Sequence, residues 1–285
     1  MLSYRHAFHA GNHADVLKHS VEILLLQHLA QKNTPFWYID THAGAGTYTL
    51  DSGYATRNAE YQNGIARLWQ RDDTPAPLLP YIEHIRALNP DGHLRLYPGS
   101  PQCARPWLRP QDRMRLFELH PSDHTLLSQH LAHKHQVKIE KNDGFAQLKA
   151  LLPPPPRRAL ILIDPPYEEK RDYSRVVHVL EDALQRFATG VYALWYPQLQ
   201  RLDSQQLPQR LKKLPVQRWL HVALSVNAPA TDGFGMHGSG LFILNPPWTL
   251  HEQLAQIMPY LVQHLGEDSR ARFVLETQTE PLKTR

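Results

Sequence analysis

Apolar residues recur at helical spacing in the first long segment of the chain, residues 14–30. The repeat is formed by Val16, Leu17, Val21, Leu24, Leu25 and Leu29. Residues three or four positions apart lie on one face of a helix, so this spacing predicts an amphipathic helix. The helix is predicted to end at residues 32–35, where a proline closes a short polar run.

Beyond residue 35, short apolar runs of strand type alternate with helical stretches. The apolar runs occupy residues 36–39, 113–120, 136–140, 158–164, 191–197, 219–226 and 240–248. Helical patterns occupy residues 124–132, 145–152 and 201–213. Strands that alternate with helices predict an α/β fold with a parallel, doubly wound, Rossmann-like sheet. The glycine-rich residues 227–240 are predicted to form a loop between the last two strands.

Residues 47–112 interrupt this alternation. They contain two or three short helical stretches and no strand pattern typical of a buried sheet, so we interpret them as a helical insertion. Residues 1–46 and 113–285 would then form one domain. Seven arginines of the insertion suit either contacts with phosphates or an ordinary solvated surface: Arg57, Arg67, Arg71, Arg86, Arg95, Arg105 and Arg109.

Composition excludes several classes of protein. Of the 285 residues, 42% are hydrophobic and 20% are charged, which is typical of a globular chain with a sizeable core. The single cysteine, Cys103, cannot form an internal disulfide, and no apolar run approaches the roughly 20 residues of a membrane span. We therefore expect a cytoplasmic protein that does not contact a membrane. Its net charge of +4 permits a nucleic-acid partner without establishing one.

Acids and glycines follow the first two predicted strands of the sheet. Asp40 precedes a turn that contains Gly44 and Gly46, where the backbone can approach a ligand closely. Because the full dinucleotide pattern of three glycines is absent, a nucleoside without a diphosphate is favoured. Glu118 ends the next strand, where an acid can accept hydrogen bonds from both ribose hydroxyls. The alternative for Glu118 is a solvated loop acid.

A third candidate follows the strand at residues 136–140. Asn142, Asp143 and Gly144 stand between that strand and a helix. An acid or amide at this place can accept the exocyclic amine of an adenine ring. The alternative is a turn in which the same side chain caps the helix, and local sequence does not separate the two.

The strongest chemical signal is Asp164-Pro165-Pro166-Tyr167, directly after the apolar run at 158–164. An amine on an adenine ring is a poor nucleophile because its lone pair is delocalised into the ring. The Asp164 carboxylate and the Pro165 carbonyl would accept its two hydrogens and free that lone pair for attack on a methyl sulfonium. Proline fixes φ and removes N–H donors, and an aromatic ring at Tyr167 would stack on an extruded base. The alternative is a rigid turn that ends a strand.

A second match to the same pattern, Asn245-Pro246-Pro247-Trp248, follows a later apolar run. Chain order separates the two. Asp164 ends the fourth strand of the series, which lies beside the first strand at the switch point where such sheets bind ligands. Asn245 is expected at the end of the last strand, far from that point, so we predict a structural turn there.

The N-terminal residues 4–19 are rich in polar side chains just before the first helix. We interpret them as a lid over the glycine turn. Lys18 or His19 would meet the carboxylate of a cofactor, and Tyr4 would face the substrate base, with Lys18 as a second candidate substrate contact. The histidines lack carboxylate or thiolate partners at recognised ligand spacing, so no metal is predicted.

Several motifs together resemble a known family. These are YRHxFHAGNxADVxKH (4–19), DTHAGAG (40–46), YPGSP (97–101), ELHPSD (118–123), DGF (143–145) and LILIDPPYE (160–168). They resemble S-adenosylmethionine-dependent adenine-N6 methyltransferases, and more narrowly the bacterial ribosomal RNA large subunit methyltransferase J family, which modifies one adenine of 23S ribosomal RNA. The resemblance spans the whole chain, including the insertion.

This resemblance implies a set of site residues. It places the contacts of S-adenosylmethionine on His19, His42, Ser100, Glu118, Asp143, Gly144 and Asp164. Tyr4 would lie beside the substrate, and Asp164 would be the catalytic acceptor. We expect a monomer with 23S ribosomal RNA as its partner. The alternatives are a DNA adenine methyltransferase and a non-catalytic RNA-binding protein that keeps the fold.

Overall fold

A central eight-stranded sheet organises the chain in the computed structural model, which describes residues 6–50, 59–131 and 135–278. The strand order is β10-β8-β9-β7-β6-β1-β4-β5. The strands are β1 (Trp37–Asp40), β4 (Arg113–Phe117), β5 (Val137–Glu140), β6 (Ala159–Ile163), β7 (Val191–Gln198), β8 (Trp219–Ser225), β9 (Gly238–Leu244) and β10 (Arg272–Gln278).

The doubly wound sheet predicted from the alternation is confirmed, with one difference in direction. Strands β5, β4, β1, β6 and β7 are parallel to one another. Strand β9, however, is antiparallel to both β7 and β8, and β10 is antiparallel to β8. Strand β9 is also not the last strand, because β10 follows it in the chain. Neither β10 nor the helix before it was predicted from the sequence.

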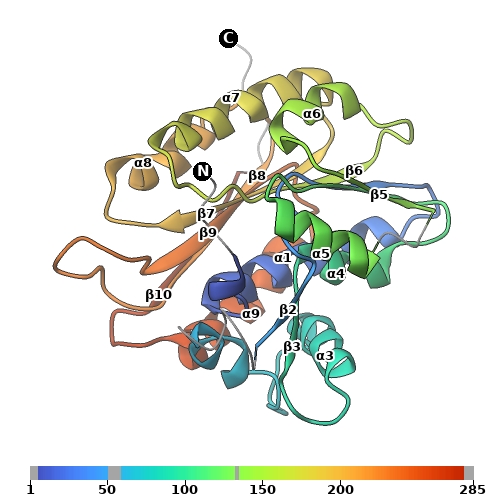
Figure 1. The fold of residues 1–285 in the computed structure, drawn as a ribbon. Coiled ribbons are helices and arrows are strands. Elements are labelled where there is room, and N and C mark those ends of the chain that lie inside the picture. The colour runs from blue at the N-terminus through green and yellow to red at the C-terminus, as the bar shows by residue number, and fades with distance from the viewer. Residues whose placement is uncertain (1–5, 51–58, 132–134, 279–285) are drawn as a thin grey trace.

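Helices cover both faces of the sheet (Figure 1). The longer ones are α1 (His13–Ala30), α3 (Leu79–Leu88), α5 (Pro121–Leu131), α6 (Gly144–Leu151), α7 (Lys170–Arg186), α8 (Leu202–Leu211) and α9 (Leu250–Leu265). Helices α6, α7 and α8 share one hydrophobic cluster with one face of the sheet. Helices α1, α5 and α9 share the other cluster, together with the insertion. Each sheet face thus has its own core.

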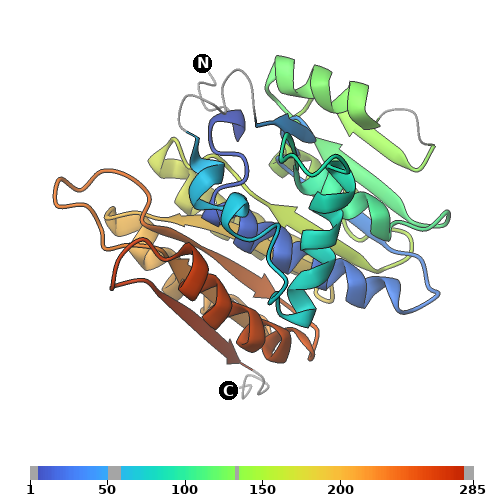
Figure 2. The same cartoon turned by 90° about the horizontal axis from the view of Figure 1, so that it is seen from below.

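Helix α1 differs from its prediction as an amphipathic helix. It crosses beneath the sheet, with α9 and the insertion around it (Figure 2), and it packs against α4 (Ser100–Ala104), α9 and β9. The face that the sequence predicts to be exposed is covered as well, since its polar residues Asp15, Lys18, His19 and Glu22 are buried. The pattern of one helix cannot reveal that later segments will cover its second face. Burying these charges requires partners inside the protein.

The insertion is wrapped onto α1 and is not purely helical. Its described part contains α3, α4 and short 3₁₀ turns, but also a two-stranded antiparallel sheet of β2 (Thr47–Thr49) and β3 (Leu96–Pro98). The expectation of no buried strand is wrong here, because Tyr97 and Pro98 of β3 are buried. Three-residue strands carry too little periodicity to be recognised in sequence.

Among the described helices, none is both long enough and apolar enough to cross a membrane.

Candidate active site

The chemistry-bearing loops converge at one edge of the sheet. Strand β1 lies between β4 and β6, and all three are parallel, so their carboxyl ends meet at the same edge. A cavity of ≈ 330 Å³ opens there. Of the predicted site residues, those that line it are Lys18, His19, His42, Ser100, Glu118, Asp143, Gly144, Asp164 and Pro165. Tyr167 does not line it, and Tyr4 lies outside the described residues.

Asp40, at the end of β1, organises the wall of this cavity. Its fully buried carboxylate accepts hydrogen bonds from Tyr38 Oη (2.9 Å), Ser100 Oγ (2.6 Å) and the amide of His42 (3.1 Å). Burial raises the pKa of Asp40 to about 6 despite these bonds. Asp40 therefore joins the insertion, through Ser100, to the glycine turn. It positions the site without being one of the residues predicted to contact a ligand.

Glu118 presents its carboxylate from the end of β4. Oε2 accepts the amide of Gly44 (2.8 Å) and Oε1 accepts the amide of His120 (2.6 Å). Gly44 has φ of +61°, and a Cβ there would lie 2.3 Å from Tyr48 Oη, so the turn requires glycine. Each carboxylate oxygen keeps a further lone pair, which suits a pair of ribose hydroxyls. Burial raises the pKa of Glu118 to about 7.

Asp143 caps helix α6, which is one of the two roles that the sequence left open. Its Oδ1 accepts the amide of Phe145 (3.0 Å) and so caps α6. Its Oδ2 is paired with Arg175 of α7, whose guanidinium lies 4.7 Å from the ring of Phe145. Burial acts to raise the pKa of Asp143, but Arg175 outweighs it and lowers the pKa. The cap does not exclude an adenine contact, since each carboxylate oxygen has two lone pairs.

Gly144 is required where α6 meets the loop after β1. A Cβ at this position would lie 2.3 Å from the carbonyl oxygen of Thr41. Any side chain would push α6 away from the cavity wall that His42 and Phe145 form, where the two rings meet edge to face at 4.8 Å. The resemblance alone had pointed to Gly144 as a cofactor contact. The structure adds that close packing of backbone on backbone demands it.

Asp164 lies just past the end of β6 with its side chain 15% exposed to the cavity. Its Oδ2 accepts a 2.7 Å hydrogen bond from Lys18 Nζ. The same ammonium donates to Asp15 Oδ1 at 2.9 Å. Burial would lower the pKa of Lys18, but the two carboxylates outweigh it and hold the pKa well above its usual value. Lys18 is thus a permanent cation that bridges two acids.

Tyr167 differs from its predicted role. Its side chain is only 3% exposed and packs 4.7 Å from the ring of Tyr173. Its hydroxyl donates to the carbonyl of Trp195 at 2.9 Å. The backbone of Tyr167 has φ of +52°, a conformation that turns the side chain back into the core of the α7 face. In this conformation the ring is not available to stack on a base, and it instead anchors the turn after Asp164.

The two predicted histidines are neutral hydrogen-bonding groups rather than cations. Burial lowers the pKa of His42 to about 4, and its Nδ1 lies 2.8 Å from Thr41 Oγ1. Burial likewise lowers the pKa of His19, despite Asp15 nearby. His19 Nδ1 is 2.9 Å from Tyr97 Oη. His19 Nε2 is a buried ring nitrogen without a hydrogen-bond partner among the described residues.

Asn245 lies at the opposite edge of the sheet, as predicted. Strand β9 is antiparallel to β7, so its carboxyl end is far from the cavity. The Asn245 side chain donates to the carbonyls of Ala188 (2.8 Å) and Gly190 (2.7 Å), and its φ is +54°. Both features belong to a structural turn.

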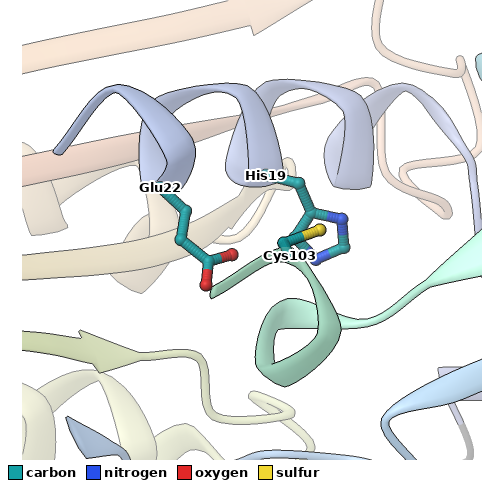
Figure 3. A group of neighbouring side chains, drawn as sticks. All are labelled: His19, Glu22 and Cys103. Carbon is teal, nitrogen blue, oxygen red and sulfur yellow. The ribbon is translucent and has the colours of Figure 1, made fainter. Parts of the chain in front are cut away.

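One group of side chains of the types that bind metals lies between α1 and α4 (Figure 3). His19 and Glu22 of α1 face Cys103 of α4, with their ligand atoms within 4.8 Å of one another. All three are fully buried. Burial raises the pKa of Glu22 and of Cys103 well above their usual values and lowers that of His19, so burial disfavours the charged form of each group.

Several arginines of the insertion form ion pairs or hydrogen bonds with other groups of the protein. Arg71, Arg95 and Arg109 pair with Asp73, Asp91 and Asp112. Arg86 donates to two backbone carbonyls, and Arg57 lies outside the described residues. These contacts favour a structural role for several of the seven.

Three residues of the site were missed from sequence: Asp15, Asp40 and Arg175. Asp15 stands three positions before Lys18, a spacing that brings charges together on a helix and could have signalled the pair. Asp40 had been noted only as the acid before the glycine turn. Arg175 lies 32 residues from Asp143, and no local pattern joins them.

Comparisons with known proteins agree with this geometry. The model of a family described as ribosomal RNA large subunit methyltransferase D, RlmJ, matches residues 33–275. The chain is 51% identical over 261 residues to ribosomal RNA large subunit methyltransferase J of Escherichia coli, covering 92% of this chain and 93% of that one. It is 45% identical to the protein of the same name from Haemophilus influenzae, covering 97% and 98%.

A solved structure gives the same picture. The crystal structure of protein LPL1258 from Legionella pneumophila superposes with a TM-score of 0.88 and 34% identity, covering 96% of this chain and 99% of that one. The fold, including the inserted segment between β1 and β4, is therefore shared over nearly the full length of both chains.

Proposed function

The chain belongs to the RlmJ family of ribosomal RNA large subunit methyltransferases, and on that premise we propose that it methylates the N6 amine of a specific adenine in 23S ribosomal RNA. The methyl donor would be S-adenosylmethionine. One observation carries the proposal: Asp164 and Pro165, which can orient an amine, share a single cavity with Glu118, which can hold a ribose. An amine acceptor and a nucleoside pocket are the two parts that this reaction needs.

The residues present fit S-adenosylmethionine. Glu118 has carboxylate lone pairs for two ribose hydroxyls, and Gly44 and Gly144 keep the walls free of side chains where the backbone is close. Asp143 and His42 would border the adenine end. His19 and Ser100 would meet the polar methionine end through neutral hydrogen-bonding groups. When bound, S-adenosylmethionine supplies the electrophilic methyl group.

Catalysis would then rest on positioning and electrostatics. The Asp164 carboxylate accepts one hydrogen of the adenine amine and the Pro165 carbonyl accepts the other, which draws the nitrogen toward tetrahedral geometry and frees its lone pair. No base need act before attack, because the amine loses its proton readily once it is cationic. Orientation of this kind accounts for much of the rate enhancement in transfer reactions. The residues proposed here use no metal, so we expect chelation of divalent ions to leave the transfer unchanged.

The direct test supplies purified protein with radiolabelled S-adenosylmethionine and, separately, in vitro transcribed 23S RNA, 16S RNA and duplex DNA, each then digested to nucleosides. We expect N6-methyladenosine in 23S RNA alone. Label in duplex DNA would favour a DNA adenine methyltransferase. The absence of label from every substrate, together with no binding of S-adenosylmethionine by calorimetry, would favour a non-catalytic RNA-binding protein.

A further inference from the structure

Asp15 is a buried carboxylate that contacts the site, and the reaction as proposed gives it no role. Its side chain is 1% exposed in the first turn of α1. Oδ2 is 2.8 Å from His6 Nε2 and accepts the amide of Gly11 at 2.9 Å. Oδ1 accepts from Lys18 Nζ at 2.9 Å. One oxygen of Asp15 thus contacts the segment before α1, and the other contacts Lys18 within α1.

The two side chains that Asp15 holds both line the cavity. His6 belongs to the short 3₁₀ turn His6–Phe8 that precedes α1, and its ring lies 5.2 Å from the ring of Tyr48. Lys18 reaches Asp164. A continuous chain of contacts therefore runs from the N-terminal segment through Asp15 and Lys18 to the proposed amine acceptor. The distance between successive polar atoms in it never exceeds 2.9 Å.

Charge holds this series of contacts together. The Lys18 ammonium is 5% exposed and lies between the buried carboxylate of Asp15 and the carboxylate of Asp164, which is 15% exposed. Charges buried in this way are costly to separate, because each loses its solvation without a replacement. Burial acts to raise the pKa of Asp15, but His6, Lys18 and His19 outweigh it and hold the pKa well below its usual value. Asp15 stays ionised, which this arrangement requires.

We infer that Asp15 is a positioning residue for methyl transfer that acts through Lys18: its Oδ1 fixes Lys18 against Asp164, while its Oδ2 is itself held by His6 and by the amide of Gly11. This inference rests on the proposed function and adds a residue to it. Without Asp15, the Lys18 ammonium has Asp164 as its only carboxylate partner among the described residues and can rotate with it. Asp164 is then less well oriented toward an amine.

The test uses Asp15→Asn, which keeps the volume but has one oxygen in place of two. The matched control is Asp112→Asn. Asp112 is equally buried, accepts the amide of Phe36 (2.9 Å) and pairs with Arg109 (2.8 Å), but it precedes β4 at the edge of the sheet away from the cavity. Both substitutions remove a buried charge, so a purely structural role predicts similar effects on turnover.

We expect kcat to fall at least about 10-fold in Asp15→Asn, as for loss of one hydrogen bond to a charged group, with Asp112→Asn near the wild-type value at a temperature where it is folded. Asp15→Asn should have no further effect on kcat when Lys18→Gln is already present, since it acts through Lys18. Unchanged kcat in Asp15→Asn, or losses that multiply in the double variant, would overturn the inference.

A spectroscopic readout covers the case in which Lys18→Gln has too little turnover to measure. The buried Lys18 ammonium should give a slowly exchanging ¹⁵N signal in the wild type and in Asp112→Asn, and should lose it in Asp15→Asn. Persistence of the signal in Asp15→Asn would overturn the inference. This readout needs no methyl transfer, so a wild type that failed to methylate RNA would defeat the proposed function while the inference was still tested.

Discussion

At the scale of single residues, Asp164 combines two tasks in one carboxylate. Its Oδ2 accepts from Lys18 at 2.7 Å, yet the side chain stays 15% exposed toward the cavity. A carboxylate offers about four lone-pair sites, so the bond to Lys18 leaves capacity for an amine hydrogen. The ion pair also fixes the rotamer of Asp164 before a substrate arrives.

Asp164→Ala should separate binding from chemistry. We expect turnover to fall by at least about 100-fold, because a charged hydrogen-bond acceptor for the reacting amine is lost. Binding of S-adenosylmethionine should be weakened but still detectable, because Glu118 and the glycine turn are unchanged. Calorimetry and single-turnover assays measure the two quantities. Wild-type turnover in this variant would refute the assigned role.

Glu118 predicts a pH dependence of cofactor affinity. Its pKa is about 7, above the usual 4.5, because it is buried. Two ribose hydroxyls would each donate a hydrogen bond to Glu118, and this favours the ionised carboxylate. Binding must therefore release the proton that Glu118 holds below pH 7. Affinity should therefore increase as the pH rises and level off above about pH 8, with a loss of up to about 10-fold per unit below pH 7.

Glu118→Gln is the control for that prediction, because an amide of the same shape does not titrate. Its affinity for S-adenosylmethionine should be lower at pH 8 and nearly independent of pH between 6 and 8. Calorimetry in buffers of different ionisation enthalpy would also report the proton released by the wild type. An equal pH slope in Glu118→Gln would assign the titration to another group.

At the scale of elements, strand direction separates two turns of nearly identical sequence. Asp164-Pro165-Pro166-Tyr167 follows the parallel strand β6, and Asn245-Pro246-Pro247-Trp248 follows the antiparallel strand β9. The first turn is therefore at the cavity and the second at the far edge. The aromatic residues of the two turns also differ from each other in exposure: Tyr167 is 3% exposed and Trp248 is 79% exposed.

Asn245→Ala should lower stability and leave turnover unchanged. The variant removes the donor to two backbone carbonyls and places alanine at a positive φ, for a total of about 2 kcal/mol in the free energy of unfolding. Thermal denaturation and the methyl-transfer assay measure the two effects. Loss of turnover in folded Asn245→Ala, with Asp164→Ala active, would show that the two turns had been assigned to the wrong roles.

At the scale of the whole molecule, the cavity is formed by several segments that are far apart in the chain. Its walls come from α1, from the turns after β1, β4, β5 and β6, and from the insertion through Ser100. The insertion also shares one hydrophobic cluster with α1, α5 and α9. A ligand that fills the cavity therefore contacts segments that separate on unfolding, and its binding is coupled to the stability of the entire fold.

S-adenosylmethionine at 100 times its dissociation constant should stabilise the fold by about 2.7 kcal/mol. For a chain of this size that corresponds to a rise in Tm of roughly 4–5 °C. Scanning calorimetry with and without the ligand measures the shift, and Glu118→Ala, which removes the acceptor for the ribose, should show a much smaller one. An equal shift in Glu118→Ala would mean that the ligand binds elsewhere.

Much of the site was predictable because its residues stand at strand ends. Glu118 and Asp164 each follow an apolar run, and parallel strands bring their carboxyl ends together whatever the details of packing. The glycine at residue 44 has a similarly local origin in its turn, whereas the need for glycine at residue 144 comes from packing against Thr41. The neutral state of His42 and the raised pKa of Glu118 were not predictable, because burial sets them and burial depends on segments far away in the chain.

By itself, then, the sequence determined the alternation of most strands and helices, though not α7, α9, β10 or the short strands β2 and β3. It also determined the acids at the ends of β1, β4, β5 and β6 and the Asp-Pro-Pro-Tyr turn, since these depend on periodicity and on neighbouring residues. Only the tertiary structure decided that α1 is buried on both faces, that β9 runs antiparallel, that the Tyr167 ring turns into the core and that Asp15 joins His6 to Lys18. Each of these follows from contacts between distant segments, and a pattern along the chain records spacing but not the partner that comes to lie against it.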